Sequence, residues 1–258
     1  MTAGRKCDEP AGRGCGRNCS YAYAGPVPLI VLWDIDHTLI ENSGVSKEIY
    51  AAAFEGVAGR TADHPARTEG RTDRLILAGM FRDHGMESPE WALIQPVLEA
   101  AGAAREADLA RRGRALPGAR EALAAVAAEP SMISSVLTGN VRTNARVKLR
   151  AFGLDGLVDI ECGAYGADAT DRGDLVDVAR SRVRAAYGTP PDTPVVLIGD
   201  TPRDVQAALD SGAHVIGVAS GVHSADELRE AGASIVLVDL TDVAALMRHL
   251  RSLTHAVC

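Results

Sequence analysis

Long apolar runs, lysine and aromatic residues are all scarce in this 258-residue sequence. No apolar run reaches the roughly 20 residues that a membrane-spanning helix needs, because Asp, Gly or Arg interrupts the longest ones. Lysine occurs only at Lys6, Lys47 and Lys148, and the formal net charge is −7. A basic face for nucleic-acid phosphates is therefore not expected. We predict neither a membrane nor a nucleic acid as a partner, and the sequence does not indicate an oligomeric state.

Cysteine forms no recognisable pattern either. Cys7, Cys15 and Cys19 fall near the N-terminus at irregular spacings, without a nearby His to complete a set of four metal ligands. The same stretch is rich in Gly, Arg and small residues, and it lacks the apolar segment of a secretory signal. We therefore expect residues 1–26 to form a disordered tail and the protein to reside in a reducing cytoplasm.

Strand and helix signals alternate along most of the remaining chain. The first predicted strand starts at residue 27 with a continuous apolar run, which is typical of a strand buried on both faces of a parallel sheet. Further strands are predicted at residues 131–137, 157–162, 193–200, 214–220 and 234–238. Helices are predicted at residues 117–128, 140–152, 174–187, 202–211, 225–231 and 243–250. This order predicts a doubly wound, Rossmann-like α/β fold with a parallel sheet.

The interval 43–113 departs from this alternation. It contains three predicted helices, at residues 47–57, 72–84 and 88–112, and no strand signal. We interpret it as an inserted all-helical cap domain, with residues 27–42 and 114–258 forming the α/β core. Gly44, Gly113 and Pro117 lie near its ends, where hinge connections are expected.

Carboxylates follow two of the predicted strands. Asp34 and Asp36 end the first strand, and a side-chain period of two places them on the same side. Asp200 and Asp204 follow the strand 193–200. Ligands of open α/β sheets bind beyond the carboxyl ends of the strands, and close carboxylates call for a cation or a shared proton. Such an oxygen-rich pocket suits Mg²⁺.

A third strand end carries neutral polar groups. Thr138, Gly139 and Asn140 follow the strand 131–137 and precede a helix. A hydroxyl and free amides at the start of a helix can bind phosphate, although such a sequence taken alone is more often a simple helix cap. Its position at the same sheet edge as the carboxylates favours an anion site.

Together these residues resemble the haloacid dehalogenase-like hydrolases. The first motif of that family, DxDx[TV], matches Asp34-Ile35-Asp36-His37-Thr38, the second motif matches Thr138, and GDxxxD matches the segment from Gly199 to Asp204. The resemblance covers roughly residues 27–238. The insertion resembles the helical C1-type cap of phosphoglycolate phosphatase-like members, and Gly70-Arg71-Thr72-Asp73 resembles their G-x-T-D segment.

The resemblance implies a Mg²⁺-dependent hydrolase of small phosphorylated metabolites that works through an aspartyl-phosphate. It implies that Asp34 is the nucleophile and Asp36 the general acid and base. The metal is then held by Asp34, Asp200 and the backbone carbonyl of Asp36, with Asp204 and Thr201 orienting its surroundings. Phosphate is bound by Thr138, Gly139 and Asn140. Candidate specificity residues in the cap are Arg71, Asp73 and Arg74, although these charges also fit a solvated face.

The third motif of the family, usually a lysine, is missing from its expected place. Lys148 lies about eight residues into the predicted helix, on the order of 12 Å along the axis from its phosphate end, which we take to be too far. Arg172 precedes the helix 174–187, where related sequences place their basic residue, and a guanidinium suits phosphate oxygens. We therefore predict Arg172 as the phosphate-binding cation.

Several alternatives remain open at this stage. A sugar-phosphate mutase or another phosphotransferase has the same motifs, and a homologue without turnover can bind a phosphorylated ligand. Three other classes of protein fit the sequence less well. A dehalogenase lacks the second aspartate of the first motif, which is Asp36 here. A phosphonate hydrolase needs a cap lysine, for which only Lys47 is available, just behind the hinge. A signalling receiver is about half as long and has no cap.

Overall fold

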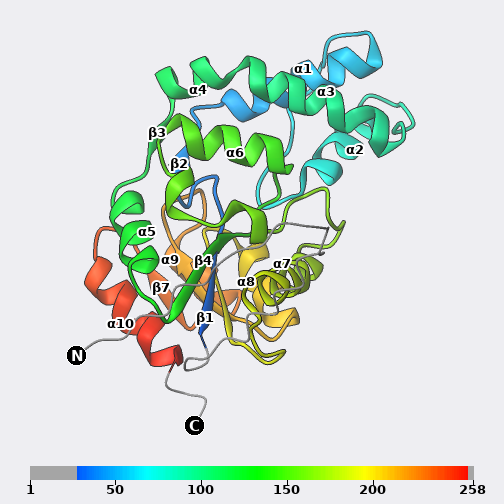
Figure 1. The fold of residues 1–258 in the computed structure, drawn as a ribbon. Helices are drawn as coiled ribbons and strands as arrows, with labels where there is room; N and C mark the ends of the chain where they lie inside the picture. The colour runs from blue at the N-terminus through cyan, green and yellow to red at the C-terminus, as the bar shows by residue number, and fades with distance from the viewer. Residues whose placement is uncertain (1–27, 255–258) are drawn as a thin grey trace, which may run out of the picture.

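A five-stranded parallel sheet forms the centre of the computed structural model, which describes residues 28–254 (Figure 1). The strands are β1 (Leu29–Trp33), β4 (Met132–Val136), β5 (Val195–Gly199), β6 (His214–Val218) and β7 (Ile235–Leu237), in the order β4-β1-β5-β6-β7. The first strand of the chain is thus central in the sheet, between β4 and β5. This confirms the predicted doubly wound, Rossmann-like α/β fold.

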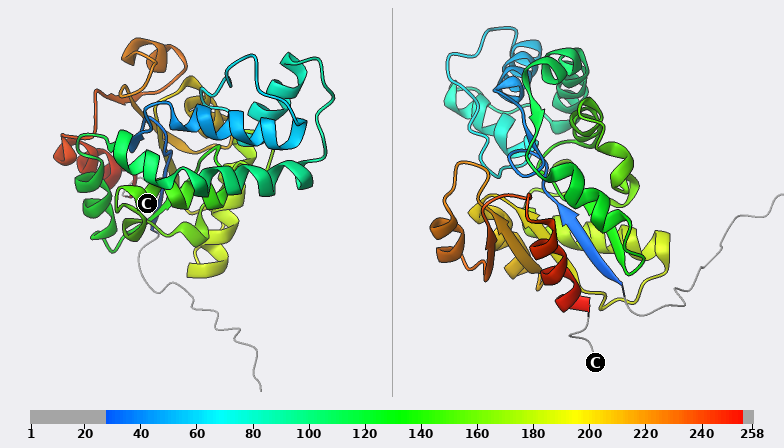
Figure 2. Two further views of the ribbon diagram at one scale, coloured as in Figure 1. Left: turned by 90° about the horizontal axis from the view of Figure 1, so that it is seen from above. Right: turned by 90° about the vertical axis from the view of Figure 1, so that its left-hand side faces the viewer.

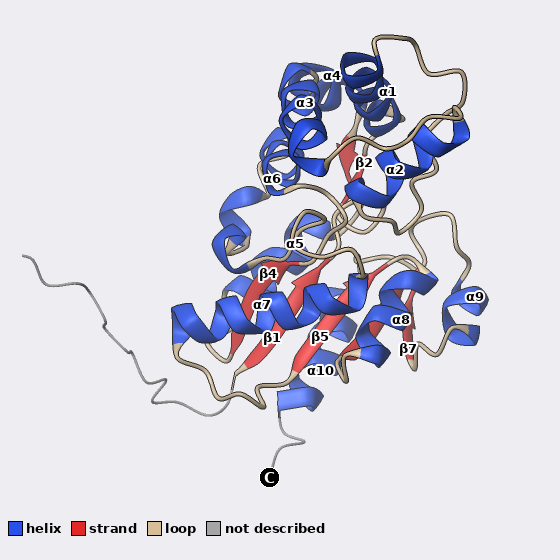
Figure 3. Ribbon diagram, turned by 90° about the vertical axis from the view of Figure 1, so that its right-hand side faces the viewer, coloured by secondary structure: helices blue, strands red, loops and turns tan. Residues whose placement is uncertain are grey.

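Both faces of the sheet are covered by helices because successive side chains of its strands point to opposite faces. Leu29, Val31 and Trp33 belong to one buried cluster, and Ile30 and Leu32 belong to another. The first cluster includes residues of α5 (Ala119–Ala127) and α10 (Val243–Thr254), and the second includes residues of α7 (Arg172–Tyr187), α8 (Pro202–Asp210) and α9 (Ala225–Glu230). Figure 3 shows α7 and α8 in front of the sheet and α5 and α10 behind it. Every residue of β1 is buried, as the continuous apolar run predicts.

Four helices gather above the carboxyl ends of the strands (Figures 1 and 2). They are α1 (Val45–Ala58), α2 (Asp73–Asp83), α3 (Trp91–Ala104) and α4 (Glu106–Arg112). Their buried side chains form a third cluster, to which Val141 also contributes. The helix α6 (Arg142–Ala151) belongs to the predicted core, yet it packs against α3 and α4 of the predicted cap. The division into a cap at residues 43–113 and a core therefore stays a prediction.

Two local expectations are wrong, and one short element was not predicted. Residues 157–162 do not form a strand; two short 3-10 helices, η1 (Asp155–Leu157) and η2 (Ile160–Cys162), occupy this region. The Asp159 carboxylate accepts hydrogen bonds from the amides of Glu161 and Cys162, at 2.9 and 3.3 Å, which favours a turn over an extended chain.

The second correction and the element that was not predicted concern the insertion and its edges. The single helix expected at residues 88–112 is divided at Arg105 into α3 and α4. An antiparallel ribbon of β2 (Ile40–Glu41) and β3 (Arg114–Ala115) joins the two connections, and its two-residue strands are too short for a periodic signal. The tail of residues 1–26 and its cysteines lie outside the described residues. No helix within residues 28–254 has the length and hydrophobicity needed to cross a membrane.

The start of α5 provides a test of the packing. Gly118 has φ 77°, and a Cβ there would lie 2.1 Å from the backbone oxygen of Leu240, whereas Gly212, with φ 67°, faces open space. We expect Gly212→Ala to lower the free energy of unfolding by about 1 kcal/mol because of its positive φ. Gly118→Ala should cost about 1–3 kcal/mol more, because the backbone must move as well. Urea denaturation of both variants measures the difference, and equal losses would contradict this packing.

Candidate active site

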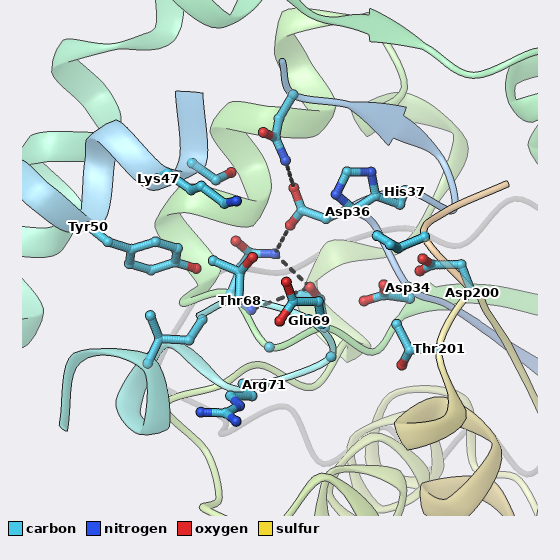
Figure 4. Close-up of a pocket in the computed structure, with 18 of the residues that line it drawn as sticks. Asp34, Asp36, His37, Lys47, Tyr50, Thr68, Glu69, Arg71, Asp200 and Thr201 are labelled. Atoms are coloured by element: carbon cyan, nitrogen blue, oxygen red, sulfur yellow. Dashed lines mark hydrogen bonds between the residues drawn. The ribbon is translucent and has the colours of Figure 1, made fainter. Parts of the chain in front are cut away.

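A pocket of about 250 Å³ opens between the carboxyl ends of the strands and the helices above them (Figure 4). The sheet side of the pocket includes Asp34, Asp36, Thr138, Gly139, Asn140, Arg172, Asp200 and Thr201. The opposite wall includes Ser46, Lys47, Tyr50, Thr68, Glu69 and Arg71. The structure therefore brings residues from three strand ends and from the predicted cap to one place.

Asp34 is the first residue after β1 and is almost completely buried. Its amide donates to the carbonyl of Ile198 in the neighbouring β5, at 2.9 Å, so the sheet itself fixes the position of this backbone. Burial raises the pKa of the Asp34 carboxyl, and the nearby carboxylates of Asp204 and Asp36 act in the same direction. Arg172 opposes them: its Nη2 donates to Asp34 Oδ1 at 2.9 Å.

Arg172 is shared by two carboxylates. The same Nη2 donates to Asp204 Oδ1 at 2.5 Å, and the pKa of Arg172 is raised in spite of burial because Asp204 and Asp34 stabilise its charge. Asp171 caps the start of α7 by accepting from the amide of Gly173, which fixes the position from which the side chain extends. The structure therefore places the predicted Arg172 beside the predicted nucleophile. Its contact with phosphate oxygens stays a prediction.

Three carboxylates form a group that can hold a metal ion. One oxygen from each of Asp34, Asp200 and Asp204 lies within 4.8 Å of the others, and all three residues are buried. Burial, together with Asp34 and Asp204, raises the pKa of Asp200 well above its usual value. Asp200 accepts one hydrogen bond, from Thr38 Oγ1 at 3.2 Å, and has no ion-pair partner within residues 28–254. A buried oxygen cluster with excess negative charge fits a hard divalent cation.

Asp204 lies nearer to the other carboxylates than the sequence alone indicates. Thr201 and Asp204 form a reciprocal capping box at the start of α8: the Thr201 hydroxyl and amide donate to Asp204 Oδ2 at 2.7 and 3.0 Å. One oxygen of Asp204 therefore accepts from Thr201 at the start of α8, and the other accepts from Arg172. Because Asp204 belongs to the group of three carboxylates, it can bind a metal ion directly as well as orient the other ligands.

Asp36 is bound by a cation that sequence analysis wrongly placed outside the site. The ammonium of Lys148 lies 2.8 and 2.6 Å from the two Asp36 oxygens and 2.7 Å from Asn140 Oδ1. Burial alone would raise the pKa of Asp36, but Lys148 and Asn140 lower it to about 2. The helical side chain points back toward the helix start, and its four-carbon stem covers the distance that the axial rise alone suggests is too long.

A periodic signal for Lys148 does exist in the sequence. Asn140, Asn144 and Lys148 are four residues apart, and all three are buried polar residues. A polar stripe at helical spacing indicates a face that contacts polar groups. Asn140 and Lys148 contact Asp36, whereas Asn144 Nδ2 donates to the Leu98 carbonyl of α3 at 3.3 Å, so only part of this face is turned toward the site.

The residues that follow β4 are held by side-chain hydrogen bonds and by close backbone packing. Asn140 Nδ2 donates to Thr138 Oγ1 at 2.7 Å and to Asp36 Oδ2 at 2.8 Å, so the neutral groups and Asp36 are one hydrogen-bonded unit. Gly139 lies against the connection that precedes α2, since a Cβ there would be 2.1 Å from the carbonyl oxygen of Arg71. The helix α6 starts at Arg142, two residues later than expected.

The three charged cap candidates have different surroundings. Arg71 lines the pocket, but in Figure 4 its guanidinium points away from Asp34 and Asp36. Arg74 lies over the ring of Trp91, 5.5 Å from its centroid, and is not a lining residue. Asp73 is buried and is also not a lining residue, so the expectation that these two face the crevice is corrected.

Asp73 instead connects the insertion to the phosphate-binding segment. Its carboxylate accepts from Tyr50 Oη at 2.6 Å and from the amide of Val141 at 2.7 Å, and its own amide donates to Gly139 O at 2.7 Å. Burial raises the pKa of the Asp73 carboxyl to about 6. Asp73 therefore positions the wall that carries Tyr50 against the strand end that carries Thr138.

This connection is testable by a double-mutant cycle. We expect Asp73→Asn to lower the free energy of unfolding by about 1–3 kcal/mol, because an amide has only one acceptor oxygen for the two buried donors. Tyr50→Phe should cost about 1 kcal/mol, and the double variant should cost less than the sum of the two. Thermal and urea denaturation provide the values. Strict additivity would show that Tyr50 and Asp73 do not act together.

Known proteins resemble this chain in sequence and in fold. Residues 31–209 match the model of the haloacid dehalogenase-like hydrolase family. Over 143 residues the chain is 28% identical to "Probable phosphatase IndB" of Dickeya dadantii (strain 3937), and the match covers 55% of this chain and 60% of that protein. The chain thus spans less than two thirds of that curated relative.

Two solved structures illustrate the shared fold. A hydrolase from Pseudomonas syringae is 26% identical, with a TM-score of 0.62, over 86% of this chain and 98% of that one. A predicted phosphoglycolate phosphatase from Haemophilus somnus 129PT is 18% identical, with a TM-score of 0.60, over 87% of this chain and 99% of that one. At that identity the second likeness shows the fold alone. Because the family match includes the carboxylates after β1 and β5, this chain belongs to the haloacid dehalogenase-like hydrolase family.

Proposed function

We propose that the protein is a Mg²⁺-dependent phosphomonoester hydrolase of small phosphorylated metabolites that forms an aspartyl-phosphate on Asp34. The observation that carries the proposal is the buried Asp34 carboxylate, which lies in one hydrogen-bonded group with Arg172 and Asp204 and within reach of Asp200. Family membership and the similarity to a probable phosphatase support it. We place the reaction in a reducing cytoplasm, with no nucleic-acid or membrane partner.

In the first step an Asp34 oxygen attacks the phosphorus in line, and the bond from phosphorus to the ester oxygen breaks with its electron pair on that oxygen. The transferring oxygens need donors that are already oriented. Arg172 supplies a fixed charge, and Thr138 with the amides of Gly139 and Asn140 supplies neutral donors. Water then attacks the phosphorus of the acyl phosphate and regenerates Asp34.

Asp36 handles the proton in both steps. In the free protein Lys148 holds its carboxylate ionised, since the pKa of Asp36 is about 2. A bound phosphate dianion places negative charge beside Asp36 and opposes the effect of Lys148, which raises the pKa and favours proton uptake with the substrate. Asp36 then donates this proton to the leaving oxygen and takes one back from the attacking water.

Mg²⁺ would be held by Asp34, Asp200 and the backbone carbonyl of Asp36, with Asp204 and Thr201 beside it. When bound, it supplies positive charge that reduces the repulsion between the carboxylates and the phosphoryl group. Arg172 already neutralises part of Asp34 and Asp204, whereas Asp200 has only the Thr38 hydroxyl. Asp200 is therefore the ligand on which metal affinity should depend most.

The first test is phosphate release from a panel of small phosphomonoesters, with Mg²⁺ and with EDTA. We expect turnover that needs Mg²⁺ and that falls at least about a thousandfold in Asp34→Asn, because the amide is not a nucleophile. Asp63→Asn, in the exposed loop before α2, serves as a matched control and should keep full activity. Wild-type turnover in Asp34→Asn would remove the proposed nucleophile. Phosphate trapping on Asp34 without release would indicate a phosphotransferase.

The role of Arg172 is tested by changing its charge and its shape separately. Arg172→Met removes the cation shared by Asp34 and Asp204, and we expect kcat to fall by about 100- to 1,000-fold. Arg172→Lys keeps the charge but not the planar fork, so its activity should lie between those of the wild type and Arg172→Met. Arg229→Met on α9 is the control, since that side chain is exposed and remote from the pocket lining. Full activity in Arg172→Met would assign phosphate binding to another group.

A further inference from the structure

The start of α1 brings polar groups to the pocket that the proposed phosphoryl transfer does not use. Gly44, Ser46 and Lys47 all line the pocket. Ser46 is only 7% exposed, and its hydroxyl is buried without a hydrogen-bond partner among the described residues. Because an unpaired buried hydroxyl is destabilising, its position beside the pocket indicates a partner supplied by a ligand.

Lys47 brings an unneutralised positive charge to the same wall. Within residues 28–254 its ammonium has neither an ion pair nor a hydrogen bond, and in Figure 4 the side chain extends from α1 toward Asp36. The nearest acid in the sequence that lines the pocket, Glu41, is occupied by the Ser43 amide at 2.7 Å and by His37 Nδ1 at 3.2 Å. Glu69, another lining residue, makes no ion pair with Lys47.

The backbone adds to this preference for negative charge. The 14-residue helix α1 begins after Gly44, whose position as N-cap provides no side-chain hydrogen bond to the first turn. The positive end of the helix dipole favours an anion, although the amides of Val45 and Lys47 already donate to the carbonyls of Asn42 and Gly44, each at 3.0 Å. A negatively charged ligand is thus favoured by three features of this wall: the Ser46 hydroxyl, the Lys47 ammonium and the start of α1.

The same wall is fixed directly to Asp36. Asn42 Nδ2 donates to Asp36 Oδ1 at 2.9 Å, and Asn42 Oδ1 accepts from the Gly44 amide at 3.0 Å. Asp36 is the group that we assign to the leaving oxygen, whereas Arg172 lies with Asp34 and Asp204. A group bound at Ser46 and Lys47 therefore belongs to the alcohol part of the ester and not to the phosphoryl group.

We infer that Ser46 and Lys47 bind an anionic group on the alcohol, so that the preferred substrates are phosphomonoesters whose alcohol carries a carboxylate or a second phosphate. This inference rests on the proposed phosphatase function. The pocket volume of about 250 Å³ lies below the roughly 300–1,000 Å³ of drug-sized ligand sites. The alcohol is therefore limited to a few carbon atoms.

Binding of three phosphonates that cannot be hydrolysed tests the inference without turnover. Propylphosphonate has an uncharged end, 3-phosphonopropionate replaces it with a carboxylate, and ethane-1,2-diphosphonate replaces it with a second phosphonate. In calorimetric titrations with Mg²⁺ we expect the wild-type protein to bind at least one charged-end ligand ten times or more tightly than propylphosphonate. The stronger of the two identifies the anion.

The variants then assign that preference to residues. Lys47→Met and Ser46→Ala should each reduce the affinity ratio of charged-end to uncharged ligand, and Lys47→Arg should restore most of it. Arg67→Gln is the control, because its side chain is 70% exposed, and it should leave the ratio unchanged. In the matching kinetic test, the kcat/KM ratio for the phosphate ester of 3-hydroxypropionate over propyl phosphate should fall in the same two variants.

Two results would overturn the inference. One is equal wild-type affinity for the charged-end and uncharged ligands, and the other is a preference that survives in both Lys47→Met and Ser46→Ala. Failure of the proposed function has a different signature. In that case no ester is hydrolysed, while the phosphonate affinities still report whether this wall selects an anion.

Discussion

Three carboxylates converge in a buried part of this protein, and the rest of the site is arranged around their mutual repulsion. Asp34, Asp200 and Asp204 present oxygens within 4.8 Å of one another. The fold maintains this arrangement because Asp34 follows the central strand and Asp200 follows its neighbour β5, so the main-chain register of the sheet sets their separation. Such a group is stable only with positive charge nearby, which is why a cation and a metal ion are both expected there.

Two cationic side chains form ion pairs with different aspartates of the site. Arg172 serves Asp34 and Asp204, and Lys148 serves Asp36. The consequence is that two aspartates only two residues apart have opposite pKa shifts: burial raises the pKa of Asp34, while Lys148 and Asn140 overcome burial and lower that of Asp36. Without ligands these shifts oppose the proposed roles, so the proposal requires a metal ion to favour ionised Asp34 and bound phosphate to raise the pKa of Asp36.

The sheet, its order of elements and the gathering of carboxylates at one edge follow from local sequence. A continuous apolar run predicts a buried parallel strand. Because ligands bind at the carboxyl ends of such strands, the sequence alone predicts that Asp34 and Asp200 lie close together. One wrong prediction has a local cause that the pattern of apolar residues does not reveal. The turn at residues 157–162 is decided by the Asp159 carboxylate, which competes with extended pairing for two amides.

Lys148 shows a second kind of failure. Its distance from the site was judged along the helix axis alone, whereas its long side chain points back toward the start of α6 and reaches Asp36. Similarly, Asp73 and Arg74 lie in a motif-like segment, yet one is buried against Tyr50 and Val141 and the other lies over Trp91. Tertiary contacts decide these positions, and Ser46 and Lys47 enter the site for the same reason.

In the proposed reaction the phosphoryl group passes through Asp34. Wild-type protein should be mixed with a hydrolysable phosphomonoester and Mg²⁺, quenched in acid within one turnover, reduced with borohydride and digested for mass spectrometry. An acyl phosphate is reduced at its carbonyl, so we expect homoserine in place of aspartate at position 34 and at no other position. Homoserine at a different aspartate, or unmodified Asp34 in protein that releases phosphate, would contradict it.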